Sequence, residues 1–89
     1  MARLDLSSHG VEESAAYGST PDALFHLGLM YCVGRDVDVD LVEAHKWFNL
    51  AALRGNEEAK RYRLEISREM SKPQISRAQR MAREWMKTH

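Results

Sequence analysis

The chain contains very few of the residues that interrupt helices or cross-link a fold. Its 89 residues include only two prolines and five glycines, which favours long helices. The single cysteine, Cys32, cannot form an internal disulfide, so nothing in the sequence indicates an oxidising compartment. No apolar run approaches the roughly 18 residues that a membrane span requires. The first ten residues, with Asp5 among them, lack the apolar segment of a secretory signal. We therefore expect a cytoplasmic protein with no membrane segment.

Charge is balanced over the whole chain but unevenly distributed along it. Thirteen Lys and Arg residues match thirteen Asp and Glu residues, so the formal net charge is zero. Residues 1–59 carry four basic and ten acidic side chains, a balance of −6, whereas residues 60–89 carry nine and three, a balance of +6. The asymmetry is consistent with a solvated basic helix face or with an electrostatically polar molecule that steers its partners.

Capping residues predict where two helices begin and end. Thr20 is a suitable N-cap, and the following Pro21 fits the first helical position because its missing N–H would be unpaired there anyway. Gly34 is expected to end this helix in a left-handed conformation. A second helix is predicted to begin at the N-cap Asp40 and to end at Gly55.

The remaining sequence predicts two further helices and an N-terminal arm. Asn56 can cap a third helix over residues 57–70. Pro73 is tolerated only in the first turn of a helix, so a fourth helix is expected to start there and to continue to about residue 87. Residues 1–18 are weakly patterned and are interpreted as an arm, separate from a helical domain over residues 19–89.

Each predicted helix has apolar residues at helical spacing on one face. Gly28 and Ala44 are small, as expected where another helix comes close. The expected inward positions are Ala23, Leu24, Leu27, Gly28 and Tyr31; Leu41, Ala44, Trp47, Phe48, Ala51 and Ala52; Ala59, Tyr62, Leu64 and Ile66; and Ile75, Ala78, Met81, Ala82 and Trp85.

The apolar pattern repeats along the chain. Adding 34 to Leu41, Ala44 and Trp47 gives Ile75, Ala78 and Met81, and Ala23 and Ala59 are 36 residues apart. A period of 34–36 residues with two helices per unit is typical of tetratricopeptide-like α-solenoids. The predicted fold is therefore all-α, with two antiparallel helical hairpins (four helices) stacked as a short tetratricopeptide-like α-solenoid.

These residues also resemble the Sel-one-like repeat, a relative of the tetratricopeptide repeat. The resemblance rests on Ala23, Leu27, Gly28, Tyr31, Gly34, Val37, Asp40, Ala44, Trp47, Ala51, Ala52, Gly55 and Ala59. It implies one repeat over residues 20–55 and a degenerate terminal repeat over residues 56–88. It also implies a scaffold or adaptor that holds proteins or peptides on a concave surface, as bacterial members do in signalling assemblies, with no cofactor and no reaction.

One position departs from the family pattern. The family linker usually reads Gly-x-Gly-Val-Pro-x-Asp, whereas residues 34–40 here read Gly-Arg-Asp-Val-Asp-Val-Asp. Asp36 thus replaces a glycine that would tolerate a positive φ. Because aspartate adopts such a conformation only at some cost, we expect a strained or reshaped turn.

Metal and catalytic sites are not indicated. The alternating aspartates Asp36, Asp38 and Asp40 resemble the start of a calcium loop, but such a loop also needs a glycine where Leu41 stands and a glutamate where Trp47 stands. His26 and Cys32 are six residues apart, on different faces of one helix, with no second pair to complete a tetrahedral metal site. No cofactor, metal or enzyme activity is therefore predicted.

The first helix carries a second apolar stripe opposite its core face. The stripe consists of Phe25, Leu29 and Val33 with Met30 beside them, and His26 lies next to it. A helix that is apolar on all sides is not a surface helix, so something must cover this stripe. The third helix and the arm could do so, or else a partner protein or a second copy of the chain. We predict that these five residues form a partner-binding surface, with help from the basic residues of the last helix.

The last helix has a basic face that includes Arg77, Arg80 and Arg83. Such a face could contact the phosphates of a nucleic acid, but the aromatic residues that usually accompany one are absent apart from Trp85, which the core needs. An acidic protein surface, or the acidic half of a second copy, is the better fit. We therefore expect a protein–protein interaction module, a small adaptor, scaffold or regulatory protein. A nucleic-acid-binding protein using its basic C-terminal helix, or a self-associating structural protein, are the alternatives.

Overall fold

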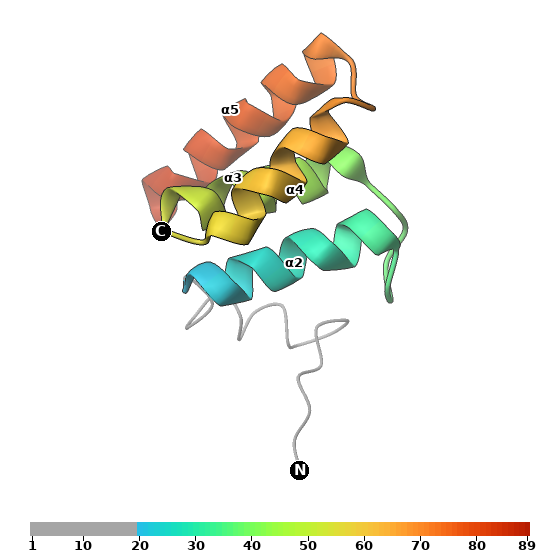
Figure 1. The fold of residues 1–89 in the computed structure, drawn as a ribbon. Coiled ribbons are helices and arrows are strands. Elements are labelled where there is room, and N and C mark those ends of the chain that lie inside the picture. Colours follow the sequence, from blue (N-terminus) through green and yellow to red (C-terminus); the bar gives the residue numbers. More distant parts are fainter. Residues whose placement is uncertain (1–19) are drawn as a thin grey trace.

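Four helices make up the part of the chain that the computed structural model describes, residues 20–89. They are α2 (Pro21–Val33), α3 (Leu41–Leu53), α4 (Glu57–Ser67) and α5 (Lys72–Thr88) (Figure 1). The predicted all-α, four-helix fold is confirmed. The predicted arm, residues 1–18, lies outside the described residues. No helix within residues 20–89 is long and apolar enough to cross a membrane.

Every described helix begins at a side chain that caps it. Thr20, Asp40, Asn56 and Ser71 each accept a hydrogen bond from the backbone N–H three residues later, at donor–acceptor distances of 2.8–3.2 Å. The first three were predicted as caps from the sequence and are confirmed. Ser71 forms a complete capping box, because the Gln74 side chain also accepts from the Ser71 N–H at 2.8 Å. The four starts are therefore encoded locally.

The linker between α2 and α3 is held by backbone hydrogen bonds. Gly34 ends α2 with φ +78°, and its N–H and that of Arg35 both donate to the Met30 carbonyl. The N–H of Asp40 donates to the Tyr31 carbonyl at 3.0 Å. Asp36 has φ +66°, a left-handed conformation no other non-glycine residue of the described part adopts. The turn is therefore strained where the sequence predicted it.

The helix α3 is the centre of the fold, because α2, α4 and α5 all pack against it. In Figure 1, α2 and α5 lie on opposite sides of α3. Because neighbouring helices cover α3 on several sides, residues outside its predicted apolar stripe are buried as well. Leu50 is fully buried and His45 is 2% exposed, although neither was among the predicted inward positions.

The second pair of helices is open rather than closely packed. The chain reverses direction between α4 and α5 (Figure 1), but these helices make few direct contacts, and α5 packs against α3 instead. The rings of Trp47 and Trp85 meet edge to face there, with centroids 5.7 Å apart. The predicted inward position of Leu64 on α4 is wrong: this side chain is 57% exposed because α5 does not cover it. The helix α4 also ends at Ser67, three residues earlier than predicted.

An aromatic cluster occupies the centre of the core. Phe48 of α3 is fully buried, and its ring lies 5.7 Å from Phe25 of α2 and 5.4 Å from Tyr62 of α4. Gly28 makes room for it, since a Cβ atom at that position would lie 2.5 Å from two atoms of the Phe48 ring. The predicted need for a small residue at position 28 thus has a specific cause.

A Gly28→Ala substitution tests this contact. Alanine favours a helix by about 1 kcal/mol over glycine, but overlap with a fixed ring typically costs about 1–3 kcal/mol. We expect the free energy of unfolding in urea, followed by circular dichroism, to fall by about 1 kcal/mol. In a Phe48→Leu background the loss should shrink or reverse. An equal loss in both backgrounds would show that the Phe48 ring is not the obstacle.

Candidate functional site

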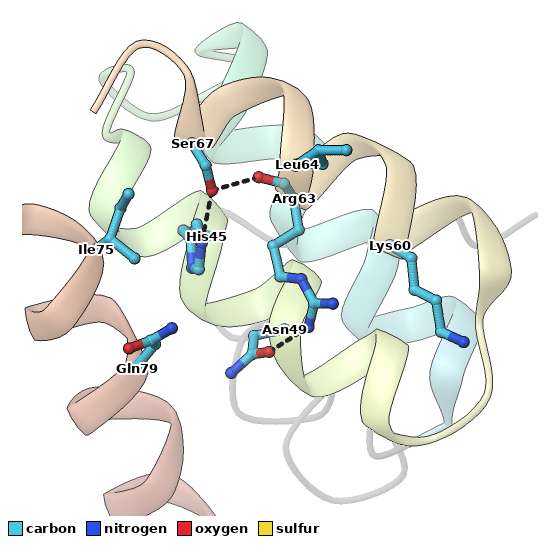
Figure 2. A pocket seen from close by; sticks show the side chains of 8 residues that line it. All are labelled: His45, Asn49, Lys60, Arg63, Leu64, Ser67, Ile75 and Gln79. Carbon is cyan, nitrogen blue, oxygen red and sulfur yellow. Dashed lines mark hydrogen bonds between the residues drawn. The ribbon is translucent and has the colours of Figure 1, made fainter. Parts of the chain in front are cut away.

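The opening between α4 and α5 is a cleft of about 560 Å³ with α3 at its base (Figure 2). Side chains from all three helices line it: His45 and Asn49 of α3, Lys60, Arg63, Leu64 and Ser67 of α4, and Ile75 and Gln79 of α5. None of these eight residues was predicted as a site residue from the sequence. The first and last of them, His45 and Gln79, are 34 positions apart in the sequence. The packing of α5 on α3 brings all eight around one cleft.

Hydrogen bonds order the base of the cleft. The Ser67 hydroxyl donates to the Arg63 carbonyl at 2.7 Å, and its oxygen is also hydrogen-bonded with Nε2 of His45, 3.1 Å away (Figure 2). The guanidinium of Arg63 donates in turn to the side-chain oxygen of Asn49. Nδ1 of His45, the other ring nitrogen, is buried without a hydrogen-bond partner.

The pairing of Ser67 with His45 is not that of a catalytic serine and its base. In a nucleophilic pair the hydroxyl donates to the imidazole, whereas the Ser67 hydroxyl donates to the Arg63 carbonyl at 2.7 Å. No carboxylate orients Nδ1 of His45. The pair therefore links α4 to α3.

Positive charge dominates the walls of the cleft. Lys60 and Arg63 are the charged residues of the lining, which includes no carboxylate. At the rim, Lys60 pairs with Glu57 at 3.4 Å, with both side chains more than half exposed, so the pairing is weak. Burial lowers the pKa of His45 below its ordinary value, and the nearby charge of Arg63 lowers it further. The cleft thus offers cationic groups and apolar surface from Leu64 and Ile75 to a ligand.

The predicted contact residues of α2 do not form one exposed surface. Phe25 packs against both Phe48 and Tyr62, with its ring 5.3 Å from that of Tyr62. Leu29 packs against the core, and Met30 is only 7% exposed. His26 is exposed, and Val33 is 66% exposed. The helix α4 thus covers part of the second apolar stripe, one of the explanations left open by the sequence.

The three predicted arginines of α5 are all exposed but point in different directions. Arg83 lies four residues after Gln79 and therefore follows it on the face of α5 that borders the cleft. Arg80 lies farther round the helix, and Arg77 lies nearly opposite Gln79 at helical spacing. Among these residues, Arg83 is the one that extends the charge of the cleft.

Metal binding has no structural basis in the described part of the chain. Within residues 20–89, no three His, Cys, Asp or Glu side chains lie close enough together to hold an ion. Cys32 is half-buried, and burial raises the pKa of its thiol, so the reactive thiolate form is disfavoured.

Comparison with known families finds one match, and it covers the first pair of helices. Residues 21–56 match the family model described as the Sel1 repeat, the family that the sequence resembles. Sel1 repeats mediate protein–protein interactions and are not catalytic. Neither the curated proteins nor the solved structures contain a match to the chain. The match includes α2, the linker and α3, and it stops before α4.

A pair of alanine substitutions on α2 separates core from surface. Phe25→Ala removes a ring held by two others, and we expect the free energy of unfolding to fall by about 2–3 kcal/mol. Val33→Ala alters an exposed side chain and should change it by less than about 0.5 kcal/mol. Urea titration of both variants provides the measurement. A Phe25→Ala variant with unchanged stability would mean that this ring belongs to a surface.

The buried imidazole predicts a pH dependence of stability. The pKa of His45 is lower in the folded than in the unfolded chain, so below about pH 6.5 the unfolded chain binds more protons. The free energy of unfolding should therefore fall as the pH is lowered from 7.5 to 5.5, by at most about 1.4 kcal/mol per pH unit for this one group. Above pH 7.5 the contribution of the neutral His45 to the free energy of unfolding is fully present.

The matched variants are His45→Gln and His26→Gln. The first removes the buried imidazole and should flatten the pH dependence of the urea midpoint over this range. The second removes an exposed imidazole and serves as the control. If both variants keep the full dependence, another group is responsible.

Proposed function

The chain carries a Sel1 repeat at residues 21–56, and from this we propose that it is a protein-interaction module, a small adaptor or scaffold, that binds its partner in the cleft between α4 and α5. The observation that carries the proposal is the cleft itself. It combines cationic walls with exposed apolar surface, and no acidic side chain lines it. Such a combination fits a polypeptide with acidic and apolar side chains.

The helices α4 and α5 then act as the terminal unit of a short solenoid. A terminal repeat needs a polar outer face, and the exposed residues of α5 include Arg77, Arg80 and Arg83. The helix α5 rests on α3, so the groove that a closely packed hairpin would fill stays open to a partner. In this proposal α4 and α5 recognise the partner, and the Sel1 repeat, residues 21–56, provides the rigid support.

Binding of nucleic acid is a weaker alternative. Trp85 is the one aromatic residue on α5, and it packs edge to face on Trp47 and stacks on His89 at a centroid distance of 4.2 Å. No face of this ring is presented to a base in the way that single-stranded nucleic-acid sites require. The exposed arginines alone supply charge without base recognition.

Site-specific photo-crosslinking tests the proposed surface. A photoreactive amino acid replaces Leu64, which is 57% exposed in the cleft, or Leu53, which is 63% exposed at the end of α3 and outside the cleft. In extract of the native host, we expect a protein adduct from position 64 and at least tenfold less from position 53. Mass spectrometry identifies the adduct. No adduct from position 64, or equal yields from both positions, would contradict the proposal.

A further inference from the structure

The linker between α2 and α3 exposes acidic and apolar side chains together. Asp36, Asp38 and Asp40 are exposed, and the Val39 side chain between them is 58% exposed. Within residues 20–89 none of these carboxylates forms an ion pair, although one oxygen of Asp40 caps α3. The linker therefore offers negative charge and apolar surface, which complement the positive charge and apolar surface of the cleft.

The shape of the linker is fixed before any contact is made. Its first residues are tied to the Met30 carbonyl at 2.8 and 3.1 Å, and its last residue is tied to the Tyr31 carbonyl. Gly34 also has Val39 packed against it, since a Cβ at Gly34 would lie 2.8 Å from a methyl group of that valine. A segment already held in one conformation loses little entropy when it docks.

The same bonds prevent the linker from entering the cleft of its own chain. They hold it at the start of α3 and against the end of α2, whereas the cleft lies between α4 and α5 (Figures 1 and 2). A second copy of the chain has no such restriction. The net charge of zero means that two copies do not repel each other as a whole.

From these complementary surfaces we propose that the acidic linker of one copy, residues 36–40, docks in the cleft between α4 and α5 of a second copy. The inference rests on the proposed function, because it takes the cleft to be a protein-binding site. Carboxylates of the linker face Lys60 and Arg63, and Val39 contacts the apolar surface of Leu64 and Ile75. The interface is heterologous, so each copy keeps a free linker at one end and a free cleft at the other.

Such head-to-tail contact continues the solenoid from one chain to the next. Helical repeats usually need three or more stacked units for stability, and this chain has α2 and α3 plus one terminal pair. Stacking of copies supplies the missing neighbours. The contact depends on exposed charges, so salt should weaken it.

A charge exchange between two variants of the full chain tests the inference. The linker variant is Asp36→Asn with Asp38→Lys, where asparagine is chosen because it tolerates the positive φ at that position. The cleft variant is Lys60→Glu with Gln79→Glu, which changes two exposed side chains and keeps the bond from Arg63 to Asn49. The control for the cleft variant is Arg68→Gln with Arg77→Glu. It gives the same change in net charge as the cleft variant, at two residues outside the cleft lining.

Sedimentation equilibrium gives the average mass at rising concentration in low and high salt. The unaltered chain and the control should exceed the monomer mass of 10.2 kDa at low salt and return toward it at high salt. Each charge variant alone should associate at least tenfold more weakly, because the linker variant has a linker of zero net charge and the cleft variant has a cleft in which acidic side chains outnumber basic ones. An equimolar mixture of the two variants should recover association as dimers, since the acidic linker of the cleft variant meets the unaltered basic cleft of the linker variant. Circular dichroism verifies that each variant is helical.

The outcomes separate this inference from the proposed function. A monomeric unaltered chain at every concentration, or a mixture that fails to recover, overturns docking of the linker. If position 64 still crosslinks a different protein in extract, the cleft binds a partner and the proposed function stands. If position 64 crosslinks nothing and the chain is monomeric, both proposals are wrong. If the cleft variant associates as strongly as the unaltered chain, the contact lies on another surface and the inference is overturned.

Discussion

The contact of α3 with each of the other three described helices is the constraint on which the rest of the structure depends. One helix can serve three neighbours only if its buried surface extends round most of its circumference, and Phe48 and Leu50 are accordingly both fully buried. The Phe48 ring needs the space that Gly28 leaves on α2, so the close approach of the first two helices and the aromatic cluster are one arrangement. Loss of that space would move α2 away and disturb the ring contacts with α4.

The cleft follows from the same constraint. Because α5 packs on α3 through Trp47 and Trp85, it does not close on α4, and the space between them remains open. The base of this space is ordered by a chain of hydrogen bonds from Asn49 and Arg63 to Ser67 and His45. A buried, uncharged imidazole thus lies beneath a cationic surface. The position of α4 and the character of the cleft depend on the same few side chains.

Local signals in the sequence were sufficient for the elements and the first hairpin. Thr20, Asp40 and Asn56 cap helices because their side chains bond to N–H groups only three residues away, which no tertiary contact has to arrange. The left-handed turn at Gly34 and the strained Asp36 are equally local. The match of residues 21–56 to the Sel1 repeat agrees with the spacing of small and aromatic residues read from the sequence. The candidate site had no such signal, because its lining comes from three helices at irregular spacing.

The sequence by itself thus determined where the helices begin, how α2 and α3 pair, and that residues 21–56 match the Sel1 repeat. It could not determine the direction in which α5 packs. An amphipathic helix specifies which of its faces is buried but not which neighbour buries it, and Ala78 and Ala82 would suit α4 as well as α3. The packing of α5 on α3 leaves Leu64 exposed, buries His45 and keeps the cleft open. This packing is decided by the tertiary structure alone. The function proposed for this chain therefore rests on a gap between helices that no periodicity encodes.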